Sequence, residues 1–356
     1  MDRDDPTSEP INGGLDVKPM RSLSEFYDSV IKRNHIWKKF DDFHTFDTGY
    51  KNTVEQRIQN MLIHCLETVP YYRYHNQKNS FSPTNLTSFP IVNRQEINMN
   101  VDRFLSGNRK GKLILNMTGG STGNPLHVYQ DSEYFDASLA TYYLFLEWSG
   151  WKPGDKILKI WDSPGSQTRC HSRVRRWFSE KVRKVSLLDA FRDFPETVND
   201  YVDAIHKNRP EIIEAFTNTI FPLSLEIRRR KIAIKHRPKG IIATANPLYP
   251  HMEKIISETF QAPVFNRYGS EEAGPIASTC PKGRMHVNPY THFVEIVDER
   301  GNPINNGTGR ILITLLTNRS MPLVRYDIGD LGTVSENKSE CPCGRDWQTL
   351  DRVSGS

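Results

Sequence analysis

The stretch LILNMTGGSTGNP, residues 113–125, decides the fold class of this chain. Leu113–Met117 is a short apolar run typical of a strand, and it leads directly into a glycine-rich loop. After the loop, Asp131 can cap a helix. The apolar stripe of that helix is predicted to consist of Phe135, Leu139, Tyr142 and Leu146. A strand, a loop and a helix in this order indicate an α/β unit.

The same order recurs along the chain. Segments with the helical spacing of apolar residues, such as 198–205 and 252–256, separate further strand-like runs. The predicted strands are Lys156–Trp161, Glu211–Phe216, Gly240–Thr244 and Pro263–Phe265. This alternation predicts an α/β fold with largely parallel sheets flanked by helices.

The C-terminal end differs in kind. Strand-like pieces at Val287–Val297, Arg310–Thr317 and Leu331–Ser335 are joined by turns such as Asn306-Gly307. A smaller β-rich subdomain is therefore predicted at residues 280–356. Residues 21–279 hold an opening helical segment and the α/β subdomains, and the aperiodic residues 1–20 are predicted to be a mobile tail.

Composition excludes several classes of protein. With 37% hydrophobic and 25% charged residues among 356, the chain is neither collagen, nor coiled coil, nor wholly disordered. Its longest apolar stretch, residues 139–151, is shorter than the roughly 20 residues of a membrane span. Residues 1–5 carry charges of both signs and precede no apolar run, so they are not a secretory signal. We expect a cytoplasmic protein with no membrane span.

The net charge of +5 suits anionic small molecules as well as nucleic acids. Basic clusters at residues 173–176 and 228–231 have no interleaved aromatic residues for base stacking, so we expect solvated helix faces there and no nucleic-acid partner.

The glycine-rich loop has the composition of a phosphate site. Three glycines let the backbone approach a ligand closely, and three hydroxyl side chains with free N–H groups suit phosphate oxygens. No Gly-Lys-Ser/Thr sequence follows, so this is not a Walker loop. Taken alone, the loop fits either a phosphate cradle or a flexible connection.

Two further motifs follow predicted strands, NRYGSEEAG at residues 266–274 and PLVRYDIGDLG at residues 322–332. In this order, the three motifs resemble the adenylate-forming superfamily of acyl-CoA synthetases, in particular its phenylacetate-CoA ligase and CapK-like branch. The resemblance extends from residue 50 to the C-terminus. Four further segments share this resemblance, namely VPYYR (69–73), FPIVNR (89–94), KPGD (152–155) and CPCGR (341–345).

The resemblance implies a role for each motif. The loop would wrap the phosphates of ATP, and Glu272 would bind Mg²⁺. Tyr268 and Gly269 would lie at the adenine, while Asp330 would accept hydrogen bonds from both ribose hydroxyls. The phosphate-binding residues would be Thr118, Gly119, Gly120, Ser121, Thr122 and Gly123, of which Thr118 and Thr122 join Glu272 as implied catalytic residues.

At three places the sequence departs from the pattern of the family, and each departure changes the role that the resemblance implies. Asn124 stands where many relatives have lysine, and Glu271 stands in the usual Ser/Thr place. The first removes a cation and the second adds an anion beside the implied triphosphate, which makes Mg²⁺ more necessary. Residues 244–248 also lack the glutamate that relatives have there, so contacts with adenine or acid are expected to differ.

The implied reaction is ATP-dependent adenylation of a carboxylic acid, aromatic acids among them, to acyl-AMP. This is the first half of an acyl-CoA ligase or acyl-transfer reaction. We expect the acid pocket between the sheet and the loops around Trp161 and Ala243–Ala245. The resemblance implies that relatives continue past the position of Ser356 into a C-terminal lid domain, which these 356 residues do not include, whether as a standalone large domain or as a sequence cut at the hinge. CoA or another acyl acceptor or carrier would then need a separate domain or protein. The alternative is a nucleotide-binding or assembly protein of the same fold with reduced catalysis.

Four residues near the C-terminal end have the composition of a zinc site. Cys280 and His286 form a Cys-x5-His pair, and Cys341 and Cys343 form a Cys-x-Cys pair. Three thiolates and one imidazole suit tetrahedral Zn²⁺ in a closed structural site. The alternative is small core cysteines beside a satisfied histidine. Cys65 and Cys170 have no ligand partner at useful spacing, and five cysteines, an odd number, argue against a disulfide framework.

Overall fold

The computed structural model describes residues 35–44, 50–109, 111, 113–117, 125–161, 184–190, 196–336 and 340–355. The predicted tail at residues 1–20, the loop residues 118–124, the basic cluster 173–176 and Cys170 lie outside these ranges. Within the described ranges, no helix is both long and apolar enough to cross a lipid bilayer.

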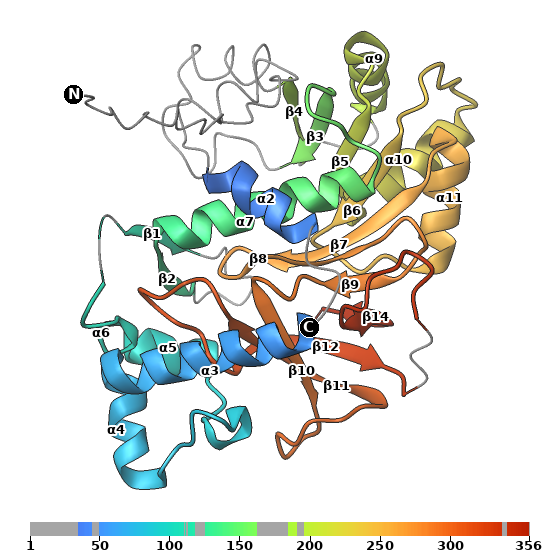
Figure 1. Ribbon diagram of the computed structural model, residues 1–356. Helices are drawn as coiled ribbons and strands as arrows, with labels where there is room; N and C mark the ends of the chain where they lie inside the picture. The colour runs from blue at the N-terminus through green and yellow to red at the C-terminus, as the bar shows by residue number, and fades with distance from the viewer. Residues whose placement is uncertain are drawn as a thin grey trace, which may run out of the picture.

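An eight-stranded sheet forms the centre of the α/β part (Figure 1). Its strand order is β13-β9-β8-β7-β6-β5-β3-β4. The parallel strands are β3 (Ile157–Trp161), β4 (Val185–Asp189), β5 (Ile212–Phe216), β6 (Gly240–Thr244) and β7 (Val264–Ser270). The antiparallel strands are β8 (Gly274–Thr279), β9 (Met285–Val287) and β13 (Thr349–Leu350). The predicted α/β fold with a largely parallel sheet is confirmed.

Helices cover both faces of this sheet. On one face, α9 (Val198–Asn208), α10 (Thr217–Arg229) and α11 (Pro250–Phe260) pack against alternate apolar residues of β3, β5 and β6. On the other face lies α7 (Ser132–Trp148), with α2 (His35–His44) beside it (Figure 1). Parallel strands that are buried on both faces have continuous apolar sequences. For this reason, the apolar runs that were predicted to be strands coincide with strands of the structure.

Helix α7 begins as predicted, and only part of its predicted apolar stripe is buried. Asp131 caps it, because the Asp131 carboxylate accepts a 3.0 Å hydrogen bond from the Tyr134 backbone N–H. The predicted stripe is correct at Leu146, which is fully buried against Ile157 and Ile212 of the sheet, and wrong at Phe135, which is 36% exposed. Phe135, Leu139 and Tyr142 line a cavity. Ala140, Leu144 and Phe145, which lie outside the predicted stripe, are fully buried in a cluster with Ile36 and Phe43 of α2.

A second, antiparallel sheet has the order β10-β11-β12-β14. Its strands are β10 (His292–Val297), β11 (Gly307–Leu315), β12 (Tyr326–Val334) and β14 (Arg352–Ser354). The single strand predicted at Val287–Val297 is split between the two sheets, because the chain turns where the Asn288 side chain accepts a hydrogen bond from Tyr290 N–H. The predicted division at residue 280 stays a prediction, and β9 and β13, which follow it, belong to the eight-stranded sheet.

The N-terminal helices pack against the antiparallel sheet. Helix α3 (Tyr50–Thr68) ends just before Pro70, the first residue of α4 (Pro70–Asn79), where the sequence predicts a break. Met61, Leu62 and Cys65 of α3 share one buried core with the apolar residues of β10, β11 and β12. Short elements η1 (Leu86–Ser88), α5 (Arg94–Met99) and α6 (Val101–Phe104) follow.

The predicted strand before the glycine-rich loop is one arm of a hairpin. Strand β1 (Ile114–Met117) pairs antiparallel with β2 (His127–Gln130), which the sequence analysis missed. The four-residue alternation of β2 is too short to be a clear signal. The order is therefore strand, loop, strand, helix.

Candidate active site

Two predicted site residues from different sheets meet. Tyr268 of β7 donates a 2.8 Å hydrogen bond from its hydroxyl to the Asp330 carboxylate of β12. Burial, followed by the Asp330 charge, raises the pKa of Tyr268 well above its ordinary value, so its hydroxyl remains a donor at neutral pH. A carboxylate has about four acceptor positions, so this bond leaves Asp330 capacity for other donors.

Gly269, which follows Tyr268, has a structural reason to be glycine. A Cβ atom built on it would lie 2.4 Å from the carbonyl oxygen of Gly274 on the neighbouring strand. The Tyr-Gly pair therefore lets β7 and β8 approach closely at the point where their register shifts.

Glu272 lies in the connection between β7 and β8 and is 2% exposed. Its carboxylate accepts a 3.0 Å hydrogen bond from the Tyr326 hydroxyl, and one oxygen lies 3.7 Å from the Arg94 guanidinium. Burial and the Glu272 carboxylate raise the pKa of Tyr326. Carboxylate oxygen is the ligand type that Mg²⁺ prefers, so Glu272 fits the ion chemically, and Tyr326 and Arg94 hold its position.

The hairpin docks onto the same connection. Asn116 of β1 donates a 2.8 Å hydrogen bond to the Glu271 carbonyl oxygen. Gln130 of β2 donates to the carbonyl oxygens of both Glu271 and Glu272, each at 3.2 Å. The two strands that flank residues 118–124 are therefore fixed to the motif that carries Glu272.

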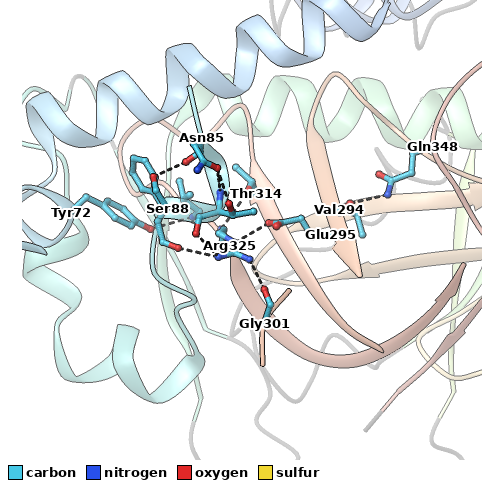
Figure 2. A network of polar contacts seen from close by, with 12 residues as sticks. Tyr72, Asn85, Ser88, Val294, Glu295, Gly301, Thr314, Arg325 and Gln348 are labelled. Atoms are coloured by element: carbon cyan, nitrogen blue, oxygen red, sulfur yellow. Dashed lines mark hydrogen bonds and ion pairs between the residues drawn. The ribbon is translucent and has the colours of Figure 1, made fainter. Parts of the chain in front are cut away.

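A buried arginine fixes strand β12 (Figure 2). Arg325 is 4% exposed and has a left-handed backbone, with φ of 50°. Its guanidinium donates to the Glu295 carboxylate at 3.1 Å and to the Gly301 carbonyl oxygen at 3.0 Å. It also donates to the carbonyl oxygens of Thr87 and Phe89. Arg325 thus joins the segment before α5 to the strand that carries Tyr326 and Asp330.

The four predicted zinc ligands come together. Their ligand atoms all lie within 4.8 Å of one another, and three of the four residues are buried. Cys280 Sγ lies 3.7 Å from Cys341 Sγ, and Cys343 Sγ lies 3.5 Å from His286 Nε2. A tetrahedral ion with bonds of about 2.1–2.3 Å separates its ligand atoms by roughly 3.5–3.8 Å. The donor set therefore fits zinc in both chemistry and spacing.

A charged cluster lies between α7 and the parallel strands. Glu214 of β5, 1% exposed, pairs with Arg267 of β7, and its other oxygen lies 3.1 Å from Lys159 Nζ of β3. The Tyr142 hydroxyl of α7 donates a 2.7 Å hydrogen bond to Glu214. This cluster was not predicted, although a charged residue inside an apolar parallel strand is a signal that could have identified it.

A strained residue follows β6 at the carboxyl ends of the strands. Ala245 has φ of 66°, a left-handed conformation rare for residues other than glycine. The Thr217 hydroxyl holds the next residue by donating a 3.0 Å hydrogen bond to the Asn246 carbonyl oxygen. Such strain is concentrated at functional sites.

The predicted site residues thus have different outcomes. Tyr268 and Asp330 are in contact, and Glu272 lies beside Tyr326, while the roles given to them and to Gly269 stay predictions. The loop residues Thr118, Gly119, Gly120, Ser121, Thr122 and Gly123 lie outside the described ranges. Sequence reasoning quoted the segments that contain Arg94 and Tyr326 but assigned neither residue a role.

Two curated proteins are similar in sequence. Protein CapK of Staphylococcus aureus is 25% identical over 280 residues, which cover 77% of this chain and 61% of CapK. A phenylacetate-coenzyme A ligase of Thermus thermophilus is 31% identical over 154 residues, which cover 41% of this chain and 34% of the ligase. The chain therefore spans less than two thirds of either relative. No family model matches the sequence.

The fold is also found among solved structures. A 2-hydroxyisobutyryl-CoA ligase, crystallised with 2-HIB-AMP and CoA, aligns with a TM-score of 0.68 at 17% identity, over 87% of this chain and 69% of that chain. The same ligase in an open conformation aligns with a TM-score of 0.67 at 16% identity, over 84% of this chain and 73% of that chain. In sequence and in fold, the chain is therefore similar to proteins of the adenylate-forming superfamily.

Proposed function

We propose that this chain adenylates a carboxylic acid with ATP, giving acyl-AMP and pyrophosphate. The observation that carries the proposal is the contact between Tyr268 and Asp330, which joins two motifs at the junction of the sheets with Glu272 close by. The similarity to CapK and to a phenylacetate-coenzyme A ligase supports it. The reaction would be the first half of a ligase reaction, whose second half passes the acyl group to CoA or another acceptor.

In this proposal the residues bind and orient the reactants, because phosphoryl chemistry needs positioning and charge neutralisation more than covalent help. Asp330 accepts hydrogen bonds from the ribose, and Tyr268 both lies at the adenine and orients Asp330. Glu272 would hold Mg²⁺, which neutralises phosphate charge when bound. The hairpin that flanks the glycine-rich loop positions Glu272 through the backbone contacts of Asn116 and Gln130.

We also propose that the acid lies between the sheet and the strand ends near Trp161 and Ala245. In parallel sheets, ligands bind at the carboxyl ends of the strands. The strained backbone of Ala245 at the end of β6 supports this placement.

We further propose that Cys280, His286, Cys341 and Cys343 hold one structural Zn²⁺. The ion would tie the end of β8 and strand β9 to the segment before β13, at the edge of the eight-stranded sheet.

The central experiment is exchange of labelled pyrophosphate into ATP with a panel of aromatic and aliphatic acids. Acid-dependent exchange supports adenylation. Nucleotide binding without exchange for any acid contradicts it and favours the alternative, a nucleotide-binding or assembly protein of this fold.

The first variant to test is Glu272→Gln. It keeps the shape of the side chain and its acceptor for Tyr326, but removes the charge that would bind the cation. We expect Mg²⁺-dependent exchange to fall about 100-fold while the melting temperature changes little. A Mg²⁺ titration of exchange measures this, with Glu299→Gln, an exposed carboxylate after β10, as the control. Equal Mg²⁺ dependence in the wild type and Glu272→Gln would remove Glu272 from the cation site.

Asp330→Ala tests the ribose contact. Because ATP and AMP share the ribose, we expect both affinities to fall by about 10-fold or more. Calorimetric titration with each nucleotide measures the effect. The control is Asp327→Ala on the same strand, since Asp327 pairs with Arg310 instead. A loss for ATP alone would contradict a ribose role.

A further inference from the structure

Part of the apolar face of α7 extends to the carboxyl ends of the strands that it covers. Leu146 packs with Ile157 and Ile212, the first residues of β3 and β5. One turn earlier in α7, the Tyr142 hydroxyl reaches Glu214 in the middle of β5. Helix α7 therefore runs antiparallel to these strands, and its N-terminal half lies towards their carboxyl ends.

Phe135 and Leu139 continue this face of α7 in its N-terminal half. Residues three, four and seven positions apart share one face of a helix, so both residues are aligned with Tyr142. At a rise of about 1.5 Å per residue, Phe135 lies roughly 16 Å from Leu146 along the helix axis. The five residues of β5 span about 13 Å from first to last, so Phe135 lies at the carboxyl ends of the strands.

A cavity of about 620 Å³ lies along this half of α7. Its apolar lining consists of Ile36 of α2, Ile114 of β1, and Phe135, Leu139 and Tyr142 of α7. The described lining contains one carboxylate, that of Asp136, and no basic residue. Ligand pockets commonly have volumes of about 300–1,000 Å³ and mostly apolar walls. The cavity therefore suits an uncharged, apolar group of small-molecule size.

The cavity borders the connection that carries Glu272. Ser138 lines it, and a Cβ atom built on Gly274, two residues after Glu272, would lie 2.9 Å from Ser138 Oγ. Ile114 lines it too, and Asn116, on the same face of β1, donates a hydrogen bond to the carbonyl oxygen of the residue before Glu272. One cavity thus adjoins both the strand ends and the candidate active site.

We propose that this cavity holds the apolar part of the acid substrate, so that the preferred substrates are monocarboxylic acids with a sizeable hydrocarbon group. The inference rests on the proposed adenylation function, because it places the reacting carboxylate beside the connection that carries Glu272. Exposed apolar side chains that gather around a hollow mark ligand-binding grooves, and Ile114 and Phe135 are 49% and 36% exposed. A second carboxylate in the cavity would lose its hydration without gaining a cation from the described lining.

A homologous series of acids tests this on the whole chain. We would titrate propanoate, pentanoate and heptanoate by calorimetry in the presence of an MgATP analogue that does not react. Each methylene transferred to an apolar site strengthens binding about fourfold, so we expect the affinity to rise about tenfold or more with every two methylenes. Heptanedioate, which has the chain length of heptanoate, should bind about tenfold or more weakly than heptanoate. Affinity that does not change with chain length would overturn the proposal.

Phe135→Ser is the main variant, because Phe135 is partly exposed and its loss should disturb the core little. We expect the gain in affinity from propanoate to heptanoate to shrink about tenfold or more, while the affinity for the MgATP analogue stays the same. Leu225→Ser is the matched control and should keep the full gain, since Leu225 is 42% exposed on α10, which covers the opposite face of the sheet. A purely structural Phe135 would lower the melting temperature and leave the gain unchanged, and that result would overturn the proposal.

Ile114→Trp changes the cavity in the opposite direction. The larger side chain would fill part of the cavity from strand β1, so we expect the acid that binds best to become shorter, with propanoate affected least. Because Ile114 is half exposed, the larger side chain should leave the melting temperature nearly unchanged. A stable Ile114→Trp protein with the chain-length preference of the wild type would contradict this placement of the hydrocarbon group.

Pyrophosphate exchange with the same acids separates the two proposals. Binding that strengthens with chain length, without exchange for any acid, would support the apolar acid site and contradict adenylation. Exchange with propanoate and heptanoate at equal rates and equal affinities would support adenylation and contradict the apolar acid site.

Discussion

Replacing Arg325 by methionine should lower the free energy of unfolding by about 3–5 kcal/mol, the cost of breaking a buried ion pair by removing one partner. The variant leaves the Glu295 carboxylate buried without its cation. It also removes the donor from the carbonyl oxygens of Thr87, Phe89 and Gly301. Burial already raises the pKa of Glu295, and without the opposing Arg325 charge that shift would increase.

Urea unfolding measures the effect, with Arg310→Met as the matched control. Arg310 also pairs with a carboxylate, that of Asp327, but its side chain is 36% exposed, so its loss should cost about 1 kcal/mol or less. Arg325→Lys should recover little, because an ammonium group cannot reproduce the fork that reaches four acceptors. If Arg325→Met lowered the free energy of unfolding no more than Arg310→Met does, the buried Arg325 network would not stabilise the antiparallel sheet more than a surface ion pair.

Loss of the proposed zinc ion should have an effect of similar size. In small zinc domains the free energy of metal binding contributes directly to folding. We therefore expect protein prepared with zinc to contain one zinc ion per chain, and Cys343→Ser to contain none and to melt roughly 5 °C lower or more. Elemental analysis and thermal melting measure the two quantities.

Cys65 supplies the control. It is fully buried in α3 and far from the cluster in sequence, so Cys65→Ala should create a small cavity and keep the zinc. A chelator should lower the melting temperature of the wild type and have no effect on Cys343→Ser. If zinc-free protein were as stable as zinc-loaded protein, the zinc proposal would be contradicted, and the cluster would consist only of four packed side chains.

The sequence predicted the features that local pattern controls. Buried parallel strands such as Gly240–Thr244 were located because apolar runs of this length, bounded by turns, have few other interpretations. The cap at Asp131 follows from one side chain and the next backbone N–H groups. The cysteines and His286 were grouped because only a few residue types bind zinc.

What the sequence did not predict depends on contacts between distant segments. The stripe of α7 was only partly correct because apolar residues surround much of the helix, and the positions of the sheet and of α2 decide which of them are buried. Arg94 and Tyr326 have no pattern that points to Glu272. The contact of Lys159 and Arg267 with one carboxylate requires knowing that β3 and β7 lie on opposite sides of β5, which is a matter of strand order.

The Arg325 network also bears on the order of folding. Arg325 contacts carbonyl groups 238 and 236 residues earlier in the chain, at Thr87 and Phe89. The entropy of closing so long a loop must be lost before these contacts can stabilise anything, so contacts of this range form slowly. We expect the helices and the parallel sheet to form first from nearer neighbours. Strand β12, with Tyr326 and Asp330, would then reach its final environment only when the segment before α5 docks, so that the proposed nucleotide side of the site is completed late in folding.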